Sequence, residues 1–80
     1  MYYTYILHSL SHPEQYYTGF TSDLVARLAR HNKGDVPHTA KFVPWEVEAY
    51  FAFKTEKTAQ AFERFLKSGS GRTFALRHFK

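Results

Sequence analysis

Tyr2-Tyr3-Thr4-Tyr5-Ile6-Leu7 opens the chain, and Tyr16-Tyr17-Thr18-Gly19-Phe20-Thr21 follows it after a short polar segment. Both stretches are rich in tyrosine, and side chains of the first alternate between two sides, which predicts β-strands over about residues 2–8 and 15–20. The Ser and Pro residues of positions 9–14 predict a turn between them. Gly19 inside the second strand indicates a close approach to the backbone or an outgoing bend. We therefore expect an antiparallel hairpin.

A helix is predicted directly after the hairpin. Thr21-Ser22-Asp23 offers three residues that can cap a helix N-terminus. Gly34 suits the left-handed conformation in which many helices end. The helix is therefore expected from about Asp23 to Asn32, and its apolar side chains are expected to lie on one inward side: Leu24, Val25, Leu28 and Ala29.

A third strand and two more helices are predicted in the second half. Residues 45–53 alternate, which predicts a strand that directs five side chains inward: Trp45, Val47, Ala49, Phe51 and Phe53. Thr55 is expected to cap a helix that reaches about Lys67, residues 68–71 to break it, and a short helix to span residues 72–78. The order β-β-α-β-α-α predicts an α+β fold, with a three-stranded antiparallel sheet flanked by helices. Eighty residues predict a single domain over positions 1–80.

The composition narrows the class of partner. The formal net charge is +4, and basic residues gather in positions 27–41 and 64–80, which favours a polyanion such as nucleic acid. The absence of Cys excludes disulfides, thiolate zinc sites and cysteine nucleophiles. Residues 67–72 lack the spacing of a Walker A loop, so no nucleotide cofactor is expected. No apolar run of membrane-spanning length and no signal-peptide pattern is found, so we expect a cytoplasmic protein with no membrane partner.

Three kinds of side chain could carry chemistry. Arg27 and His31 stand four positions apart and therefore share one helix face. This face is either a solvated polar surface or part of a site beside the tyrosines. Glu63 stands at the rim of a predicted buried stripe, where a carboxylate either holds a hard divalent cation or pairs with Lys67. The tyrosines are either packing residues or hydrogen-bonding groups that become bases when nearby cations lower their pKa.

The chain resembles the GIY-YIG endonuclease superfamily over nearly its whole length, in particular its small stand-alone bacterial proteins. Tyr3-Thr4-Tyr5 occupies the place of the first motif and Tyr17-Thr18-Gly19 that of the second, although a Tyr and a Thr replace the Gly and Ile of the first. Segments 38–42 and 68–72 are similar to one subgroup of these small proteins.

The spacing beyond the motifs agrees with this resemblance. Arg27 follows Gly19 by eight residues, His31 follows Arg27 by four, and Glu63 stands where the family carries its metal-binding glutamate. The resemblance implies hydrolysis of a phosphodiester with one divalent ion, Mg²⁺ or Mn²⁺, bound by Glu63. It also implies a set of catalytic residues: Tyr5, Tyr17, Arg27, His31 and Glu63.

The resemblance further implies a role for each of these groups. Tyr17 would position or deprotonate the attacking water with Tyr5 beside it, His31 is the alternative base, and Arg27 would stabilise charge on the phosphoryl oxygens. The nucleic acid backbone would be held by five basic residues: Arg30, Lys33, Lys41, Lys67 and Arg72.

Three hypotheses for the function follow. The leading one is a DNA endonuclease that acts on branched, flapped or damaged structures in repair or recombination, with RNA as an alternative substrate. The second is a nucleic-acid-binding domain with the nuclease fold and little activity, recruited by a protein partner. The third is a scaffold that contacts no nucleic acid.

Overall fold

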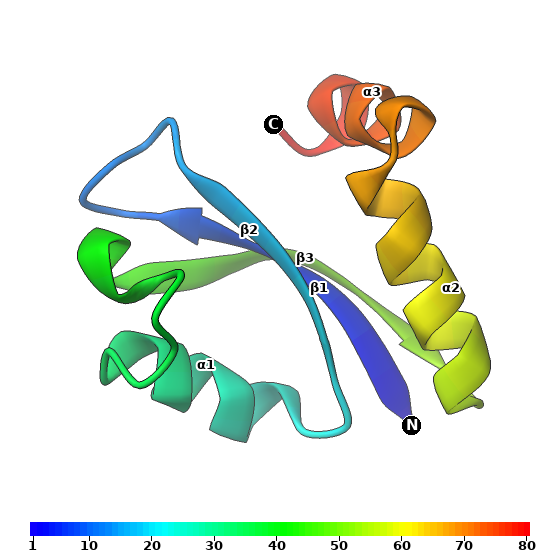
Figure 1. Ribbon diagram of the computed structural model, residues 1–80, viewed down its shortest axis with the longest axis horizontal. Helices are drawn as coiled ribbons and strands as arrows, with labels where there is room; N and C mark the ends of the chain where they lie inside the picture. Colours follow the sequence, from blue (N-terminus) through cyan, green and yellow to red (C-terminus); the bar gives the residue numbers. More distant parts are fainter.

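The computed structural model describes residues 1–80 and contains one three-stranded sheet with helices on both of its faces (Figure 1). The elements in chain order are β1 (Tyr2–Ser9), β2 (Tyr16–Thr21), α1 (Leu24–Asn32), the short 3-10 helix η1 (Ala40–Phe42), β3 (Trp45–Phe53), α2 (Glu56–Lys67) and α3 (Gly69–His78). This order confirms the predicted α+β fold.

β1 is the central strand of the sheet. The strand order is β2-β1-β3, and β1 pairs antiparallel with both neighbours, so that Tyr5 lies opposite Gly19 on one side and Tyr50 on the other. In Figure 1, α1 lies on one face of this sheet while α2 and α3 lie on the other. The predicted hairpin of the first two strands is therefore confirmed, and its first strand, β1, has helices over both of its faces.

The alternation of β1 serves two separate hydrophobic clusters. Tyr5 and Leu7 are fully buried on the α1 side, whereas Ile6 is fully buried on the other side with Leu66 of α2 and Ala75 of α3. Because successive side chains of a strand point to opposite faces, a single strand contributes to both clusters.

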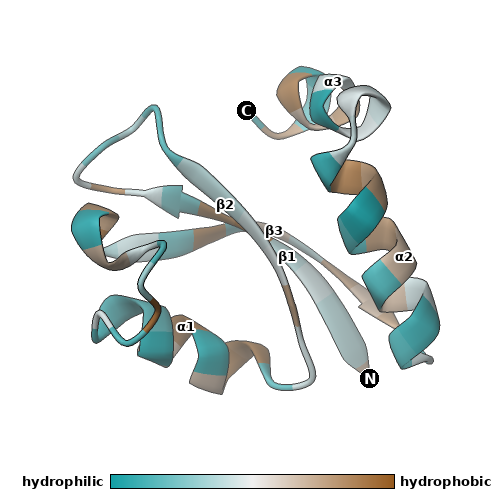
Figure 2. Ribbon diagram, in the orientation of Figure 1, coloured by the Kyte–Doolittle hydropathy of each residue, from teal (hydrophilic) through white to brown (hydrophobic).

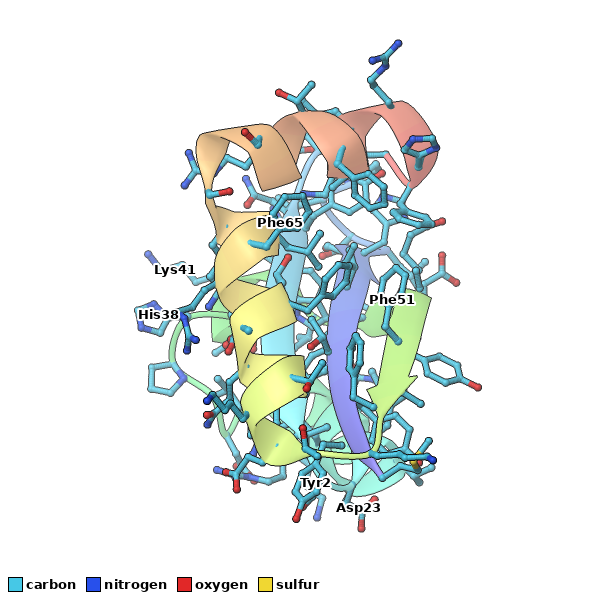
Figure 3. All side chains as sticks on the ribbon, turned by 90° about the vertical axis from the view of Figure 1, so that its right-hand side faces the viewer. Tyr2, Asp23, His38, Lys41, Phe51 and Phe65 are labelled. Atoms are coloured by element: carbon cyan, nitrogen blue, oxygen red, sulfur yellow. The ribbon has the colours of Figure 1, made fainter.

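α2 has the bounds and the cap that the sequence predicts. The Thr55 side chain accepts a hydrogen bond from the backbone N–H of Thr58, which satisfies one of the free donors at the helix start. Figure 2 shows α2 in alternating hydrophilic and hydrophobic bands, as expected of a helix with one face on the sheet. In Figure 3, where α2 faces the viewer, α3 lies across its end above Phe65. None of the helices is both long and apolar enough to span a bilayer.

β3 departs from a regular strand near its middle. The neighbouring residues Ile6 and Leu7 of β1 lie opposite Ala49 and Val47 of β3, so that Glu48 is left without a partner in a β-bulge. One additional residue in a strand exchanges the faces to which all following side chains point.

The bulge corrects the prediction that the five apolar residues of β3 face a single core. Trp45 and Val47 pack in the cluster under α1. Phe51 and Phe53 pack instead against Phe62 of α2, at ring-centroid distances of 4.7 and 5.6 Å. Both faces of the sheet are covered by helices, so an apolar side chain of β3 is buried whichever face it points to. A strand with a bulge and one without it therefore show the same alternation of apolar and polar residues, and the sequence did not reveal the bulge.

α1 presents a different face to the sheet from the one expected. Its two leucines pack inward as predicted, but Val25 is 82% exposed and Ala29 is also exposed. Arg27 and His31 complete the inward face, at the positions that follow the first leucine by three and seven residues. The prediction for Val25 and Ala29 was wrong because it selected residues by polarity, and this inner face contains polar groups. Gly34 has φ +80°, which confirms the predicted left-handed end after α1.

α3 begins three residues earlier than predicted. Ser68 ends α2 and caps α3, and residues 69–71 form the first turn of α3 rather than a break. Gly71 is needed there because a Cβ would overlap the Phe65 carbonyl oxygen and lie 2.6 Å from the Leu66 Cα. Gly71, which suggested a loop, instead allows α2 and α3 to pack closely where they meet.

Candidate active site

Tyr5 and Tyr17 lie on the same face of the sheet. Tyr17 is opposite Leu7 and Gly19 is opposite Tyr5 in the β1–β2 ladder, and the two tyrosine rings are 6.3 Å apart between centroids. The Tyr5 phenol lies over Gly19: a Cβ on that residue would be 2.5 Å from Tyr5 Cζ and 2.9 Å from Tyr17 Cε2. Gly19 therefore provides the close approach that its place inside a strand indicates.

His31 connects Tyr5 to the loop that follows α1. Its side chain is fully buried, with Nε2 2.9 Å from the Tyr5 hydroxyl and Nδ1 2.7 Å from the Thr39 hydroxyl. Burial lowers the pKa of His31 below its ordinary value of 6.5, and the positive charges of Arg27 and Arg30 act in the same direction. The ring is therefore neutral at pH 7, and both of its nitrogens already have a protein partner.

Arg27 is half-buried between α1 and the second strand. Its Nη1 donates a hydrogen bond to the Phe20 carbonyl oxygen at 3.3 Å. Burial raises the pKa of Tyr5 to about 12, the nearby guanidinium of Arg27 opposes that rise, and the charges of Tyr17 and Glu63 add to it. Tyr5 therefore keeps its proton at neutral pH, while part of the five-donor guanidinium fork of Arg27 is left for an anion.

Glu63 comes from α2, which covers the face of the sheet opposite to α1. Its side chain is 22% exposed, and Oε2 accepts a hydrogen bond from Lys67 Nζ at 3.0 Å, so the alternative surface pair considered for this residue is present. Its charge is the smallest of the causes that raise the pKa of Tyr5, and no hydrogen bond joins Glu63 to the other four predicted catalytic residues.

The surroundings of Glu63 show which kind of metal ion it could hold. No group of three His, Cys, Asp or Glu side chains lies close enough to hold an ion by itself. Mg²⁺ commonly takes only one or two carboxylates and completes its shell with waters and substrate phosphates. A single, partly exposed carboxylate fits an ion whose other ligands are waters and the substrate phosphate.

Exposure divides the five predicted catalytic residues into two groups. Tyr17, Arg27 and Glu63 are each half-buried and reach the surface, whereas Tyr5 and His31 are both 0% exposed. The first three can contact a substrate directly. The two buried residues can act only through their neighbours.

The five basic residues predicted to hold a nucleic acid backbone are all exposed: Arg30 and Lys33 in or just after α1, Lys41 in η1, Lys67 at the end of α2 and Arg72 in α3. In Figure 3, Lys41 projects beside His38 on the opposite side of α2 from Phe51. Lys67 is the one that also contacts a predicted catalytic residue, Glu63.

Thr39, whose hydroxyl contacts His31, was not among the site residues predicted from the sequence. It is fully buried in the segment between α1 and η1, and its carbonyl oxygen accepts a hydrogen bond from Trp45 Nε1 at 3.0 Å. A single threonine in a polar loop carries no periodic signal, so only the similarity of segment 38–42 to a family subgroup pointed towards it.

Comparison with known proteins adds one finding. A family model described as the GIY-YIG catalytic domain matches residues 1–75, which includes the whole polar network from Tyr5 to Glu63. No curated protein matches the sequence.

Proposed function

The chain belongs to the GIY-YIG family, whose catalytic domain is a metal-dependent phosphodiesterase, and we propose that residues 1–80 act as one domain that cuts DNA endonucleolytically. The proposal is supported above all by the convergence of Tyr5, Tyr17, Arg27 and His31 on one face of the sheet, with Glu63 in electrostatic range.

Arg27 is the residue that we assign to the scissile phosphate. Its guanidinium is held by the Phe20 carbonyl, and the remaining donors of the fork are free for an anion. Donors that are fixed in advance stabilise the charge that develops on the phosphoryl oxygens, and removal of one such donor costs about 10²–10³ in rate.

Tyr17 is the residue that we assign to the attacking water. It is the tyrosine of the pair that reaches the surface, and its ring lies 5.0 Å from the His31 ring between centroids. Tyr17 positions the water or takes its proton, and the hydroxide adds to phosphorus as the bond to the leaving oxygen breaks. His31 is the alternative acceptor.

Glu63 is the residue that we assign to the metal ion. When bound, Mg²⁺ or Mn²⁺ supplies Lewis-acid polarisation of the phosphate and stabilises the leaving oxygen. The Lys67 side chain is 52% exposed, and an i,i+4 ion pair at the surface is worth only about 0.3–0.5 kcal/mol, so the carboxylate can exchange its partner.

The substrate that we propose is DNA of branched, flapped or damaged structure, as encountered in repair and recombination. The basic residues are suited to phosphates, whose contacts carry no sequence information, and no element is set apart to read base edges. Shape rather than sequence would then select the substrate.

The test is nicking of labelled branched and duplex DNA by the purified protein, with and without Mg²⁺ or Mn²⁺. We expect Arg27→Ala and Glu63→Ala each to lower the rate by about 10²-fold or more. Arg77→Ala in α3 and Glu56→Ala at the start of α2 change exposed residues of the same types outside the proposed site, and both should cut as wild type does. Unchanged cutting by both site variants would show that the assigned site is wrong.

The occupied carboxylate of Glu63 favours one alternative, a binding domain that has kept the nuclease fold with little activity. Salt-dependent DNA binding that neither metal converts into cleavage would support this alternative against the endonuclease.

A further inference from the structure

Thr39 lies at the end of a chain of hydrogen bonds that starts at Tyr5. The Tyr5 phenol contacts His31 Nε2 at 2.9 Å, and His31 Nδ1 contacts the Thr39 hydroxyl at 2.7 Å. The hydroxyl also contacts the Val36 carbonyl oxygen at 3.3 Å. Every intermediate member is fully buried, so water cannot replace any of these partners.

The direction of each hydrogen bond follows from the two ends of the chain. A carbonyl oxygen can only accept, so the single hydroxyl proton of Thr39 is donated to Val36. Thr39 must then accept from His31, which places the ring proton on Nδ1. A neutral imidazole carries one N–H, so Nε2 is bare and accepts the Tyr5 proton.

The Tyr5 end of the chain agrees with this arrangement. His31 Nε2 is the only hydrogen-bond partner of the buried Tyr5 hydroxyl, so the phenolic proton is paired only when Nε2 accepts it. All donors therefore point from Tyr5 towards Val36. The opposite tautomer of His31 would bring its Nε2–H to the phenol and leave the phenolic proton without an acceptor, and the hydroxyl of Thr39 would have to turn away from Val36.

The backbone around Thr39 is held from two sides. Its carbonyl oxygen accepts from Trp45 Nε1 at 3.0 Å. The backbone N–H of Trp45 donates to Asn32 Oδ1 at 2.6 Å, and Asn32 Nδ2 donates to the Trp45 carbonyl at 3.1 Å. Because Asn32 follows His31 directly in α1, the same contacts fix the hydroxyl of Thr39 relative to the imidazole.

We propose that Thr39 is a positioning residue, which holds His31 in its Nδ1-protonated tautomer so that Tyr5 donates to His31 and is fixed beside Tyr17. Thr39 does not touch the substrate and acts through His31 and Tyr5. The consequence for activity rests on the proposed function of Tyr17, whereas the tautomer is a property of the folded protein alone.

The test is ¹⁵N NMR of the histidine rings in the full chain, combined with nicking kinetics. Protonated and bare ring nitrogens have well-separated shifts, and the His31 signals are assigned by their absence from His31→Asn. In the wild type we expect Nδ1 protonated and Nε2 bare. Thr39→Val keeps the shape of the side chain without the acceptor, and we expect it to move the proton to Nε2 or to give a mixture, with kcat lowered about tenfold and KM within twofold. Thr39→Ser restores the hydroxyl and should retain the wild-type tautomer and rate.

A wild-type His31 protonated at Nε2, or wild-type shifts in Thr39→Val, would overturn the proposal. The wild-type spectrum decides this even where Thr39→Val does not fold. If no DNA is cut by any form of the protein, the endonuclease assignment fails, and the tautomer measurement still decides the role of Thr39.

Discussion

Replacement of Gly19 by alanine tests whether the tyrosines are held by contact with the backbone of the neighbouring strand. The added Cβ would lie 2.5 Å from Tyr5 Cζ and 2.9 Å from Tyr17 Cε2, whereas ordinary contact begins at 3.4 Å. The Tyr5 ring must therefore move by about 1 Å, and it is fully buried with its hydroxyl on His31. A displacement of about 1 Å at a reacting site is sufficient to lower the rate about 10²-fold.

Gly19→Ala should destabilise the protein, although the backbone conformation alone would predict a small stabilisation. Gly19 does not have a positive φ, so alanine fits the strand and would by itself stabilise the protein by about 0.4–1 kcal/mol through the unfolded chain. Overpacking costs about 1–3 kcal/mol, and loss of the Tyr5–His31 hydrogen bond adds about 1 kcal/mol. A net loss of about 2 kcal/mol lowers the Tm of a domain of this size by roughly 8–16 °C.

The assay combines thermal unfolding with nicking kinetics well below the Tm of every variant. Gly69→Ala is the matched control, because nothing lies within 4 Å of a Cβ at that position. It should keep the wild-type rate and a Tm equal to or slightly above that of the wild type. A Gly19→Ala protein with an unchanged Tm and an unchanged rate would refute the account of how Tyr5 and Tyr17 are held.

Two further predictions concern the two cores. Because burial lowers the pKa of His31 in the folded protein, the free energy of unfolding should fall as the pH drops below 6.5, by at most about 1.4 kcal/mol per pH unit. Urea unfolding at a series of pH values should show that His31→Asn loses this dependence and that the exposed His78→Asn keeps it. The same pH dependence in His31→Asn and in the wild type would contradict the burial of a neutral ring. Gly71→Ala should destabilise the protein by about 3 kcal/mol, because its Cβ meets the backbone of Phe65 rather than a movable side chain. Urea unfolding compares it with Gly69→Ala, and similar free energies of unfolding for the two variants would exclude the close contact of α2 and α3.

The elements of the fold could be predicted because local signals agreed with the tertiary structure. Thr55 caps α2 as its position predicts, and the first two tyrosine-rich segments form the hairpin. The inner face of α1 could not be predicted, because His31 is polar and buried while Val25 is apolar and exposed. Local rules commonly fail where a site requires polar groups inside, and both errors in α1 lie on the helix that carries the site.

The candidate site could be predicted in part for the same reason. Spacing brought Arg27 and His31 to one helix face, and the structure places both beside Tyr5. What spacing could not give is depth: His31 and Tyr5 are fully buried, whereas Tyr17 reaches the surface. Thr39 enters through a loop, and loop residues have no periodicity from which a contact can be predicted.

The bulge in β3 also affects how copies of the protein meet one another. β3 is an outer strand of nine residues, and a free strand edge of that length is a template on which another chain can add a strand. The bulge interrupts the regular spacing of N–H and C=O groups, and the exposed carboxylates of Glu46 and Glu48 repel an identical edge. The bulge at Glu48, which lets β3 contribute to two cores, therefore also protects an aromatic-rich chain against edge-to-edge aggregation.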